Sequence, residues 1–275
     1  MNSTPKEFIQ INSITEPGLE AYSQKNEVGL LRANEPDPGF FICESSKVIL
    51  RALDAGYEPV SVLTAIEEPD TETAAVYERC KNVSIYFAPD PVFRELSGYA
   101  LTGGILAQMR RKALPSMEET IKGKSLIAVL ENVQNPTNIG AIFRSAAAMK
   151  VEAVIITSDC ADPYYRRSER TSMGCVFQIP WTKTDKDGDY LKILKENGFA
   201  TVAMALNDKA VSISDPAIKK EEKIAVILGN EGYGLKEDTV ENSDYVAMIP
   251  MNPVVDSLNV SAAGAVMFWE LSQKR

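Results

Sequence analysis

The sequence predicts an α/β protein with two domains, and three observations support this fold class. The chain has 275 residues, 45% of them apolar, which is enough for two ordinary domains with a core in each. Strand and helix signals alternate between residues 40 and 111. After residue 122, apolar runs of strand length are followed by polar turns and helical stretches, a pattern typical of a parallel sheet.

The N-terminal part, residues 1–111, is predicted to be a small α/β domain behind an extension. We interpret residues 1 to about 30 as a helical extension. The alternating strand and helix signals that follow lie at 40–43, 46–55, 60–65, 71–80, 83–87 and 105–109. Residues 112–121 then combine a proline and charged side chains with a loss of periodicity, which indicates an interdomain linker.

The C-terminal part, residues 122–275, is predicted to form a parallel sheet with helices between several of its strands. The expected strands lie near residues 126–130, 153–156, 176–179, 200–204, 224–228 and 246–249. The last of these is followed by a loop and a helix-like run over residues 262–271.

Three loops in the C-terminal part carry polar residues between a strand and a helix. Residues 138–144 read Asn-x-Gly-Ala-x-x-Arg, residues 229–235 read Gly-Asn-Glu-Gly-x-Gly-Leu, and residues 249–261 read Ile-Pro-Met followed by Ser-Leu-Asn-Val-Ser. A Ser-x-Asn-x-Ser cluster that opens a helix places hydroxyls, an amide and free backbone N–H groups around one cavity, which suits a small, partly polar ligand. The order of the glycines matches neither the dinucleotide fingerprint nor the P-loop.

Each polar residue of these loops also has an ordinary structural interpretation. Arg144 lies in a small, apolar helix, from which its side chain can extend to water. Asn138 and Asn259 have the residue type of helix N-caps, as does Ser257. Glu231 can be an acid in the first turn of a helix. From the residues alone, both interpretations stay open.

Composition excludes several function classes. The chain has no histidine, which rules out Ser-His-Asp and Cys-His catalysis and any His-ligated metal. Its four cysteines are scattered beside apolar runs without a CxxC pair, so we expect buried free thiols in a reducing cytosol and no metal. No apolar run approaches the ~18 residues of a membrane span, and the N-terminus lacks an apolar signal region, so a cytoplasmic protein is expected.

The net charge of −9 argues mildly against promiscuous binding of a polyanion, but basic residues cluster locally. These residues are candidates for RNA contact, with solvated surface as the alternative: Arg110, Arg111, Arg166, Arg167 and Arg170.

The three motifs, in this order, closely resemble those of the SpoU (TrmH-type) RNA 2′-O-ribose methyltransferases, which belong to the knotted SPOUT superfamily. The resemblance runs from about Gly123 to the C-terminus, with a weaker fourth match at residues 170–177. It departs from the family at Pro253, where relatives usually have glycine. The N-terminal domain resembles, more loosely, the ribosomal-protein-like substrate-binding domain of many such enzymes.

The resemblance implies a C-terminal trefoil-knotted methyltransferase domain that forms a homodimer and uses S-adenosylmethionine to methylate tRNA or rRNA. It implies catalytic roles for Arg144, Asn138, Glu231, Ser257 and Asn259, and cofactor binding by Gly229, Ile249 and Leu258. Because Pro253 fixes φ and lacks an N–H, an inactive RNA- or nucleotide-binding protein on the same fold is the alternative.

Overall fold

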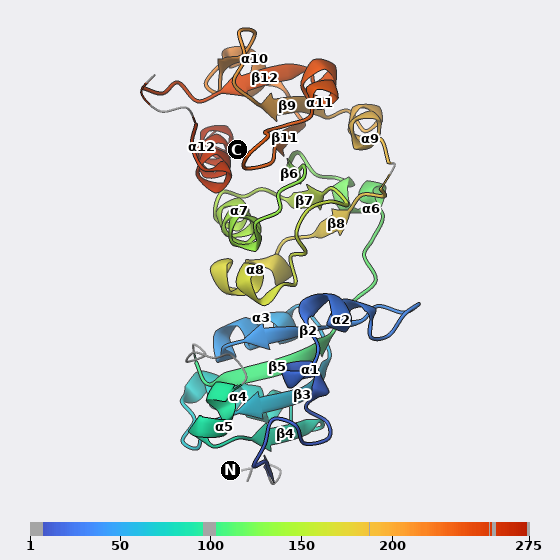
Figure 1. Ribbon diagram of the computed structural model, residues 1–275. Helices are drawn as coiled ribbons and strands as arrows, with labels where there is room; N and C mark the ends of the chain where they lie inside the picture. Colours follow the sequence, from blue (N-terminus) through green and yellow to red (C-terminus); the bar gives the residue numbers. More distant parts are fainter. Residues whose placement is uncertain (1–7, 96–102, 187, 253, 255–256, 274–275) are drawn as a thin grey trace. The chain divides into compact units, whose positions relative to one another are not determined.

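The computed structural model describes residues 8–95, 103–186, 188–252, 254 and 257–273 (Figure 1). By its contacts the chain divides into two compact units. Unit 1 holds the described residues up to Ala113 together with Tyr164–Phe177, and unit 2 holds Leu114–Pro163 and the residues from Gln178 onward. The division therefore differs from the predicted one, because 14 residues of the predicted C-terminal domain, 164–177, pack in unit 1.

Unit 1 is built on a five-stranded mixed sheet with the strand order β1-β4-β3-β5-β2. Strands β1, β4 and β3 are parallel to one another, whereas β5 is antiparallel to both of its neighbours, β3 and β2. The alternation predicted for residues 40–111 is confirmed. The bounds are β1 Ile9–Gln10, β2 Phe40–Glu44, β3 Pro59–Thr64, β4 Ser84–Phe87 and β5 Ile105–Arg110, with helices α1 Glu20–Ser23, α2 Glu27–Arg32, α3 Ser46–Asp54, α4 Thr71–Arg79 and α5 Asp90–Glu95.

The segment 164–177 joins unit 1 through an aromatic cluster. The Tyr164 ring stacks on Phe41 with a centroid distance of 4.8 Å, and the Phe177 ring lies 5.2 Å from that of Tyr57. Between these rings the segment forms α8, Arg166–Thr171, and the 3₁₀ turn η1, Cys175–Phe177. The strand predicted at 176–179 is therefore wrong: a short apolar run has no decisive period, and here it is buried by aromatic packing.

Two other predictions need correction. The predicted linker ends in a helix, α6 (Met117–Ile121), which begins with a capping box between Ser116 and Glu119 and buries its apolar residues in unit 2. The predicted N-terminal helical extension instead combines a strand, β1, with the two short helices α1 and α2, and residues 1–7 lie outside the described part.

Unit 2 is built on a seven-stranded sheet with the order β10-β12-β9-β11-β6-β7-β8, in which every neighbouring pair is parallel. Five of the six predicted strands are confirmed. The bounds are β6 Leu126–Leu130, β7 Ala153–Ile156, β8 Trp181–Lys183, β9 Ala200–Met204, β10 Val211–Ser212, β11 Ile224–Leu228 and β12 Tyr245–Met248. The remaining helices are α7 Pro136–Ala148, α9 Tyr190–Glu196, α10 Pro216–Lys220, α11 Glu237–Asn242 and α12 Val260–Ser272.

Helices cover both faces of this sheet, which explains why its strands read as continuous apolar runs (Figure 1). Ile127 and Val129 of β6 point toward one face, where they pack with residues of α6 and α9. On the other face α12 packs on α7 and on β11. The approach to β11 is close, because a Cβ added at Gly264 of α12 would lie 2.8 Å from Leu228 Cδ1.

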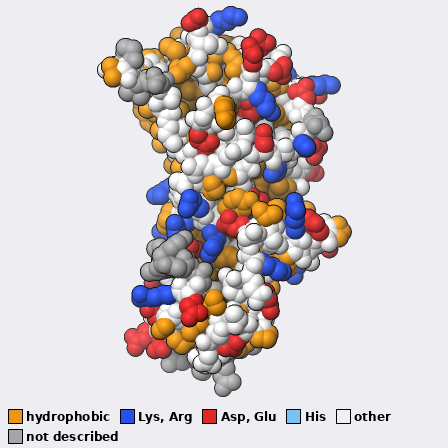
Figure 2. Space-filling view, viewed as in Figure 1, with side chains coloured by type: hydrophobic (Ala, Val, Ile, Leu, Met, Phe, Trp, Pro, Cys, Tyr) orange, Lys and Arg blue, Asp and Glu red, His pale blue; other side chains and the backbone are white. Residues whose placement is uncertain are grey.

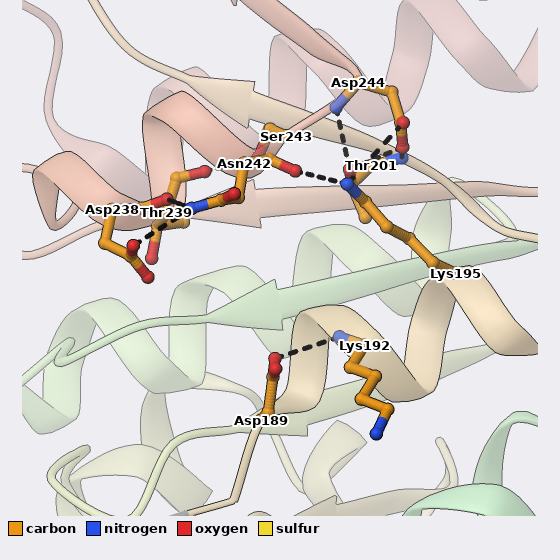
Figure 3. A network of polar contacts seen from close by, with 9 residues as sticks. All are labelled: Asp189, Lys192, Lys195, Thr201, Asp238, Thr239, Asn242, Ser243 and Asp244. Carbon is orange, nitrogen blue, oxygen red and sulfur yellow. Dashed lines mark hydrogen bonds and ion pairs between the residues drawn. The ribbon is translucent and has the colours of Figure 1, made fainter.

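The amino-terminal edge of the sheet is held by a polar network (Figure 3). Asp244 accepts hydrogen bonds from the Thr201 backbone N–H at 2.8 Å and from its hydroxyl at 2.7 Å. Lys195 donates to the Asn242 carbonyl at 2.5 Å and lies 3.8 Å from the Asp244 carboxylate. These contacts fix the start of β12 against β9. An open depression of about 540 Å³ beside them contains mixed charges and no motif residue.

The four cysteines are free thiols and all are buried, which confirms the expectation from their apolar surroundings. Burial raises the pKa of the Cys43 and Cys160 thiols, so both stay protonated at neutral pH. In the described part of the chain, the helices are too short or too polar to cross a bilayer.

Candidate active site

The three motif loops meet at the carboxyl-terminal edge of the sheet of unit 2. Loop 131–135 follows β6, loop 229–236 follows β11, and loop 249–259 follows β12. Because the strands are parallel, the ends from which these loops emerge lie on one edge, where open α/β sheets bind ligands. This edge is opposite the contacts between Thr201 and Asp244 that Figure 3 shows.

A chain of side-chain hydrogen bonds joins the three motifs. Asn259 Nδ2 donates to Asn138 Oδ1 at 3.1 Å, and Asn138 Nδ2 donates to Glu231 Oε1 at 2.8 Å. Asn138 is only 6% exposed, so both ends of its amide are engaged in a largely desolvated place. Asn138 is thereby brought into contact with residues 93 and 121 positions away in the sequence.

The Glu231 carboxylate also fixes the start of α7. It accepts hydrogen bonds from the backbone N–H of Asn135 at 3.1 Å and of Gln134 at 3.4 Å. Partial burial acts to raise the pKa of Glu231, but the hydrogen bonds from Asn138 and from backbone N–H groups outweigh it, so its pKa lies below the usual range. Glu231 is therefore an anion at neutral pH and a poor proton acceptor, which suits a positioning role.

Helix caps set the direction of the two helices that carry these residues. Asn135 caps α7, with its Oδ1 accepting from the Thr137 N–H at 2.9 Å, and Pro136 follows at the first helical position. Asn259 caps α12, with its Oδ1 accepting from the Ser261 N–H at 2.9 Å. The N-cap interpretation of Asn259 is therefore confirmed by its side-chain oxygen, and its side-chain nitrogen also holds Asn138. Asn138 itself is not the cap of α7.

The loop 229–236 is shaped by backbone proximity. A Cβ at Gly229 would lie 2.5 Å from both Gly234 C and Leu235 N, so no other residue fits there without moving the backbone. Asn230 Oδ1 accepts from the Gly232 and Tyr233 N–H groups at 2.8 and 3.0 Å, and its Nδ2 donates to the Asn132 carbonyl at 2.8 Å. The loop is thereby closed on itself and tied to the loop after β6.

The residues predicted to hold the cofactor come after the carboxyl ends of β11 and β12, two strands that have β9 between them in the sheet. Gly229 follows β11, Ile249 follows β12 and is half-buried, and Leu258 is 40% exposed just before α12. A tight glycine turn, two aliphatic side chains and free strand ends supply the apolar slot and the backbone donors and acceptors that an adenine ring requires. The residues present fit an adenosine-containing cofactor.

Arg144 lies on α7, six residues after Asn138, and its side chain is exposed. Six residues on a helix correspond to a rotation of about 240° at about 100° per residue, so Arg144 faces away from Asn138. To the described residues it makes neither a hydrogen bond nor an ion pair. Ser257 is also exposed, and Pro253 lies outside the described residues.

Sequence reasoning missed Glu131, the first residue after β6, which is 1% exposed. It accepts hydrogen bonds from Tyr190, Thr239 and the backbone of Lys236. A signal was present in the sequence, because Glu131 directly follows a wholly apolar strand. Buried carboxylates are rare and need hydrogen-bond or charge partners, so a carboxylate at such a position is a candidate for a specific role.

The predicted RNA-binding residues belong to unit 1, and one of them is buried. Arg111 is 8% exposed, donates to the Phe40 carbonyl at 3.1 Å and lies over the Tyr164 ring at 4.6 Å, so it is occupied by packing and we omit it from the proposed RNA surface. Arg110 and Arg167 are exposed, and Arg170 is half exposed and paired with Glu44 at 3.4 Å. Arg166 is half-buried. Figure 2 shows Lys and Arg side chains gathering over the region of α8.

Within the described residues, His, Cys, Asp and Glu side chains form no group of three or more that could hold a metal ion. The described residues of the site supply amides, the carboxylates of Glu131 and Glu231, the exposed Arg144 and Ser257, and backbone groups.

Residues 125–269 match the model of the SpoU rRNA methylase family, and this range contains all three motif loops. The chain belongs to this family. An uncharacterized tRNA/rRNA methyltransferase of Mycobacterium bovis is 33% identical over 258 residues, which span 93% of this chain and 88% of that protein. The 23S rRNA (guanosine-2′-O-)-methyltransferase RlmB of Xanthomonas campestris is 33% identical over 162 residues, 59% of this chain and 64% of that protein.

Solved structures of the family show the same fold over nearly the whole chain. An RNA 2′-O ribose methyltransferase has a TM-score of 0.76 at 25% identity, with 97% of this chain and 99% of that chain covered. An AdoMet-bound rRNA methyltransferase from Sinorhizobium meliloti has a TM-score of 0.80 at 20% identity, with 96% of this chain and 97% of that chain covered.

Proposed function

We propose that this protein transfers a methyl group from S-adenosylmethionine to a ribose 2′-hydroxyl of RNA. The observation that carries the proposal is the hydrogen-bonded chain Asn259–Asn138–Glu231, which unites the three motifs of a methylase family at the ligand-binding edge of a parallel sheet. The relatives that are named as 2′-O-methyltransferases support the ribose 2′-hydroxyl as the group that accepts the methyl.

The cofactor is held by Gly229, Ile249 and Leu258 in this proposal. The closed turn at Gly229 presents backbone donors, and the two aliphatic side chains flank the adenine. S-adenosylmethionine supplies a methyl carbon already activated on a sulfonium, so that the C–S bond breaks as the ribose oxygen forms the new C–O bond. The chain therefore has to place the 2′-oxygen in line and assist the loss of its proton.

Arg144 binds and orients the substrate. Arginine is nearly always protonated, so it is a poor general base, but its planar fork grips a phosphate in a bidentate manner. The exposed guanidinium of Arg144 holds the substrate phosphate near the 2′-oxygen, and the hydroxyl proton leaves with the help of that phosphate. Asn138 and Glu231, with Ser257 and Asn259, line the site and fix its loops.

RNA binding by the N-terminal domain, residues 1–111, completes the proposal. In unit 1, the accessible basic residues Arg110, Arg167 and Arg170, with the half-buried Arg166, supply phosphate contacts. Only Arg110 lies within residues 1–111, and the other three lie on the segment 164–177, which packs in the same unit. We further propose that this domain is ribosomal-protein-like. The 2′-hydroxyl distinguishes RNA from DNA at the methylation site. The substrate class is tRNA or rRNA, and we place the protein in the cytoplasm with these substrates.

We also propose a trefoil knot in unit 2 and a homodimer that pairs through α12. Its Val266 and Trp269 are 39% and 50% exposed and lie on one side of that helix, three residues apart. A Trp269→Glu variant should shift the mass measured by light scattering from dimer to monomer. Leu206→Glu is the control, because Leu206 is 54% exposed elsewhere in unit 2. A wild-type protein of monomer mass at micromolar concentration would refute the dimer.

The decisive experiment maps 2′-O-methylated riboses in total RNA from cells with and without this protein. We expect at least one site to depend on it. Purified protein should transfer labelled methyl to RNA from the deficient strain, and calorimetry should detect binding of S-adenosylmethionine. If the cofactor binds but no RNA pool accepts methyl, the protein is an RNA- or nucleotide-binding module on this fold.

A further inference from the structure

Glu131 holds both ends of the loop that follows β11. Its backbone N–H donates to the carbonyl of Leu228, the last residue of β11, at 2.8 Å. Its side-chain Oε1 accepts from the backbone N–H of Lys236, the residue that precedes α11, at 2.8 Å. The seven residues 229–235 lie between these two points. A single residue after β6 therefore closes the loop that contains Gly229 and Glu231.

The other carboxylate oxygen is held by two hydroxyls. Tyr190 of α9 and Thr239 of α11 each donate to Glu131 Oε2 at 2.6 Å. Burial raises the pKa of the Tyr190 hydroxyl, and its bond to Glu131 raises it further, so this donor keeps its proton. All the donors converge on one carboxylate that is 1% exposed.

Fold stability alone does not explain why a buried carboxylate occurs at this position. A buried carboxylate loses its hydration, and apolar residues of similar volume often serve a core equally well or better. A carboxylate adds directional hydrogen bonds. The Glu131 carboxylate accepts one from a backbone N–H and two from hydroxyls, and together these bonds fix the position of the loop. The next residue, Asn132, accepts from Asn230 through its carbonyl, so the contact between the two loops continues to their exposed ends.

We propose that Glu131 is the positioning residue of the cofactor loop: by clamping Leu228 and Lys236 it sets the geometry in which residues 229–235 bind S-adenosylmethionine. This inference rests on the proposed function. Glu131 touches no reacting group, and it acts through the backbone of the loop. It should therefore govern cofactor affinity more than the rate of methyl transfer once the cofactor is bound.

The chain offers a matched control at the opposite end of β6. Glu152 accepts three hydrogen bonds, from the Ser125 N–H at 2.7 Å, the Ser125 hydroxyl at 2.8 Å and the Leu126 N–H at 3.0 Å. It fixes the start of the same strand and is remote from the motif loops. Glu131→Gln and Glu152→Gln thus both weaken a multiply bonded carboxylate at one end of β6, but only Glu131 contacts the loop after β11.

The test compares these two variants in three measurements. For Glu131→Gln we expect the dissociation constant of S-adenosylmethionine to rise about tenfold, as for loss of a residue that orients a ligand-binding group. The transfer rate at saturating cofactor should stay within about threefold of wild type, and amide hydrogens of residues 232–236 should exchange faster in the free protein. Glu152→Gln should lower only the melting temperature.

Equal melting-temperature losses in the two variants, with unchanged cofactor affinity and unchanged exchange in the loop, would reduce Glu131 to a structural residue. If Glu131→Gln does not fold, Glu131→Asp carries the same expectation, because its carboxylate is one methylene shorter but keeps its charge. If the wild type binds no S-adenosylmethionine, the proposed function fails, while exchange in the free protein still decides whether Glu131 orders the loop.

Discussion

At the scale of single residues, the candidate site depends on amides rather than on strong acids or bases. Asn138 is the central one, because it donates to Glu231 and accepts from Asn259 while almost fully buried. The only carboxylate in that chain of hydrogen bonds is held anionic by its donors. In the proposed reaction such a site only has to orient the reactants, because the methyl group is already activated on the cofactor, and Arg144 is the residue proposed to bind the RNA phosphate.

Replacing Arg144 should separate catalysis from cofactor binding. We expect Arg144→Ala to lower methyl transfer about a hundredfold or more, as for loss of one preorganised charge-stabilising donor, with cofactor affinity nearly unchanged. Arg144→Lys should restore little, since an ammonium lacks the bidentate fork. The measurements are transfer of labelled methyl and calorimetric affinity. Lys192→Ala on α9 is the control, being an exposed cation on the other face of the sheet. Wild-type transfer by Arg144→Ala would make this arginine structural.

Glu231 should contribute a pH-dependent part of the stability. Because its pKa is lower in the folded than in the unfolded state, its stabilisation is fully present above the unfolded value of about 4.3 and is lost as the pH falls through the folded value. The difference in free energy of unfolding between wild type and Glu231→Gln should therefore be constant near neutrality and shrink in acid. In the Asn138→Ala background the pH-dependent part of this difference should be smaller, and its loss should be complete at a higher pH, because one donor that lowers the folded pKa of Glu231 is gone. Denaturant titrations at several pH values measure the free energy of unfolding of each variant. A difference between wild type and Glu231→Gln that does not change with pH would contradict the prediction.

At the scale of elements, the loop after β11 is the most constrained part of the site. Its path is fixed by the glycine at its start, by the side chain of Asn230 within it, and by Glu131 outside it. A short helix, α11, follows directly. The loop therefore has little conformational freedom. Adding a methyl group where its backbone is tightly packed should weaken its binding of the cofactor.

Two glycines of this loop should respond differently to the same change. Gly229→Ala puts a Cβ within 2.5 Å of backbone atoms, so we expect the cofactor dissociation constant to rise at least about tenfold and the melting temperature to fall. Gly232→Ala is the control, since its Cβ would meet only Asn230 Oδ1, at an ordinary 3.6 Å. Calorimetry and thermal unfolding of both variants decide the matter. Equal cofactor affinities in the two would show that the close approach at Gly229 is not needed for binding.

At the scale of the whole molecule, the two units are not two consecutive pieces of the chain. The segment 164–177 lies within the range that matches the methylase family, yet its contacts are those of unit 1. Tyr164 and Phe177 are 3% and 7% exposed and are covered by Phe41 and Tyr57. The methylase region therefore contributes part of the core of the N-terminal unit.

A truncated protein that begins at Leu114 should consequently expose an apolar segment. We expect it to bind a hydrophobic dye more strongly and to be less soluble than the full chain, because Tyr164 and Phe177 lose the residues that cover them. The same truncation carrying Tyr164→Ser and Phe177→Ser should bind less dye. Dye fluorescence and the soluble fraction are the measurements. A soluble truncated protein with dye binding no higher than that of the full chain would show that unit 2 can bury the segment itself.

The sequence by itself determined the local elements and the family. Continuous apolar runs predicted β6, β7, β9, β11 and β12, because strands covered on both faces carry no polar positions. Alternating signals predicted the strands and helices of residues 40–111 for an equally local reason. The three motifs, read in order, predicted the family, which the match over residues 125–269 confirms, and the structure brings Asn138, Glu231 and Asn259 of these motifs into contact.

Only the tertiary structure decided what depends on packing between distant residues. The apolar run at 175–177 became a 3₁₀ turn because aromatic rings of unit 1 cover Phe177, and Arg111 became a packed residue because Tyr164 lies under its guanidinium. The side chain of Glu131 is held by hydrogen-bond donors that lie 59 to 108 residues away in the sequence. Hydrophobic periodicity and propensity report on neighbours within a few residues, whereas a buried carboxylate or an aromatic cluster is specified by partners that only the folded chain brings together.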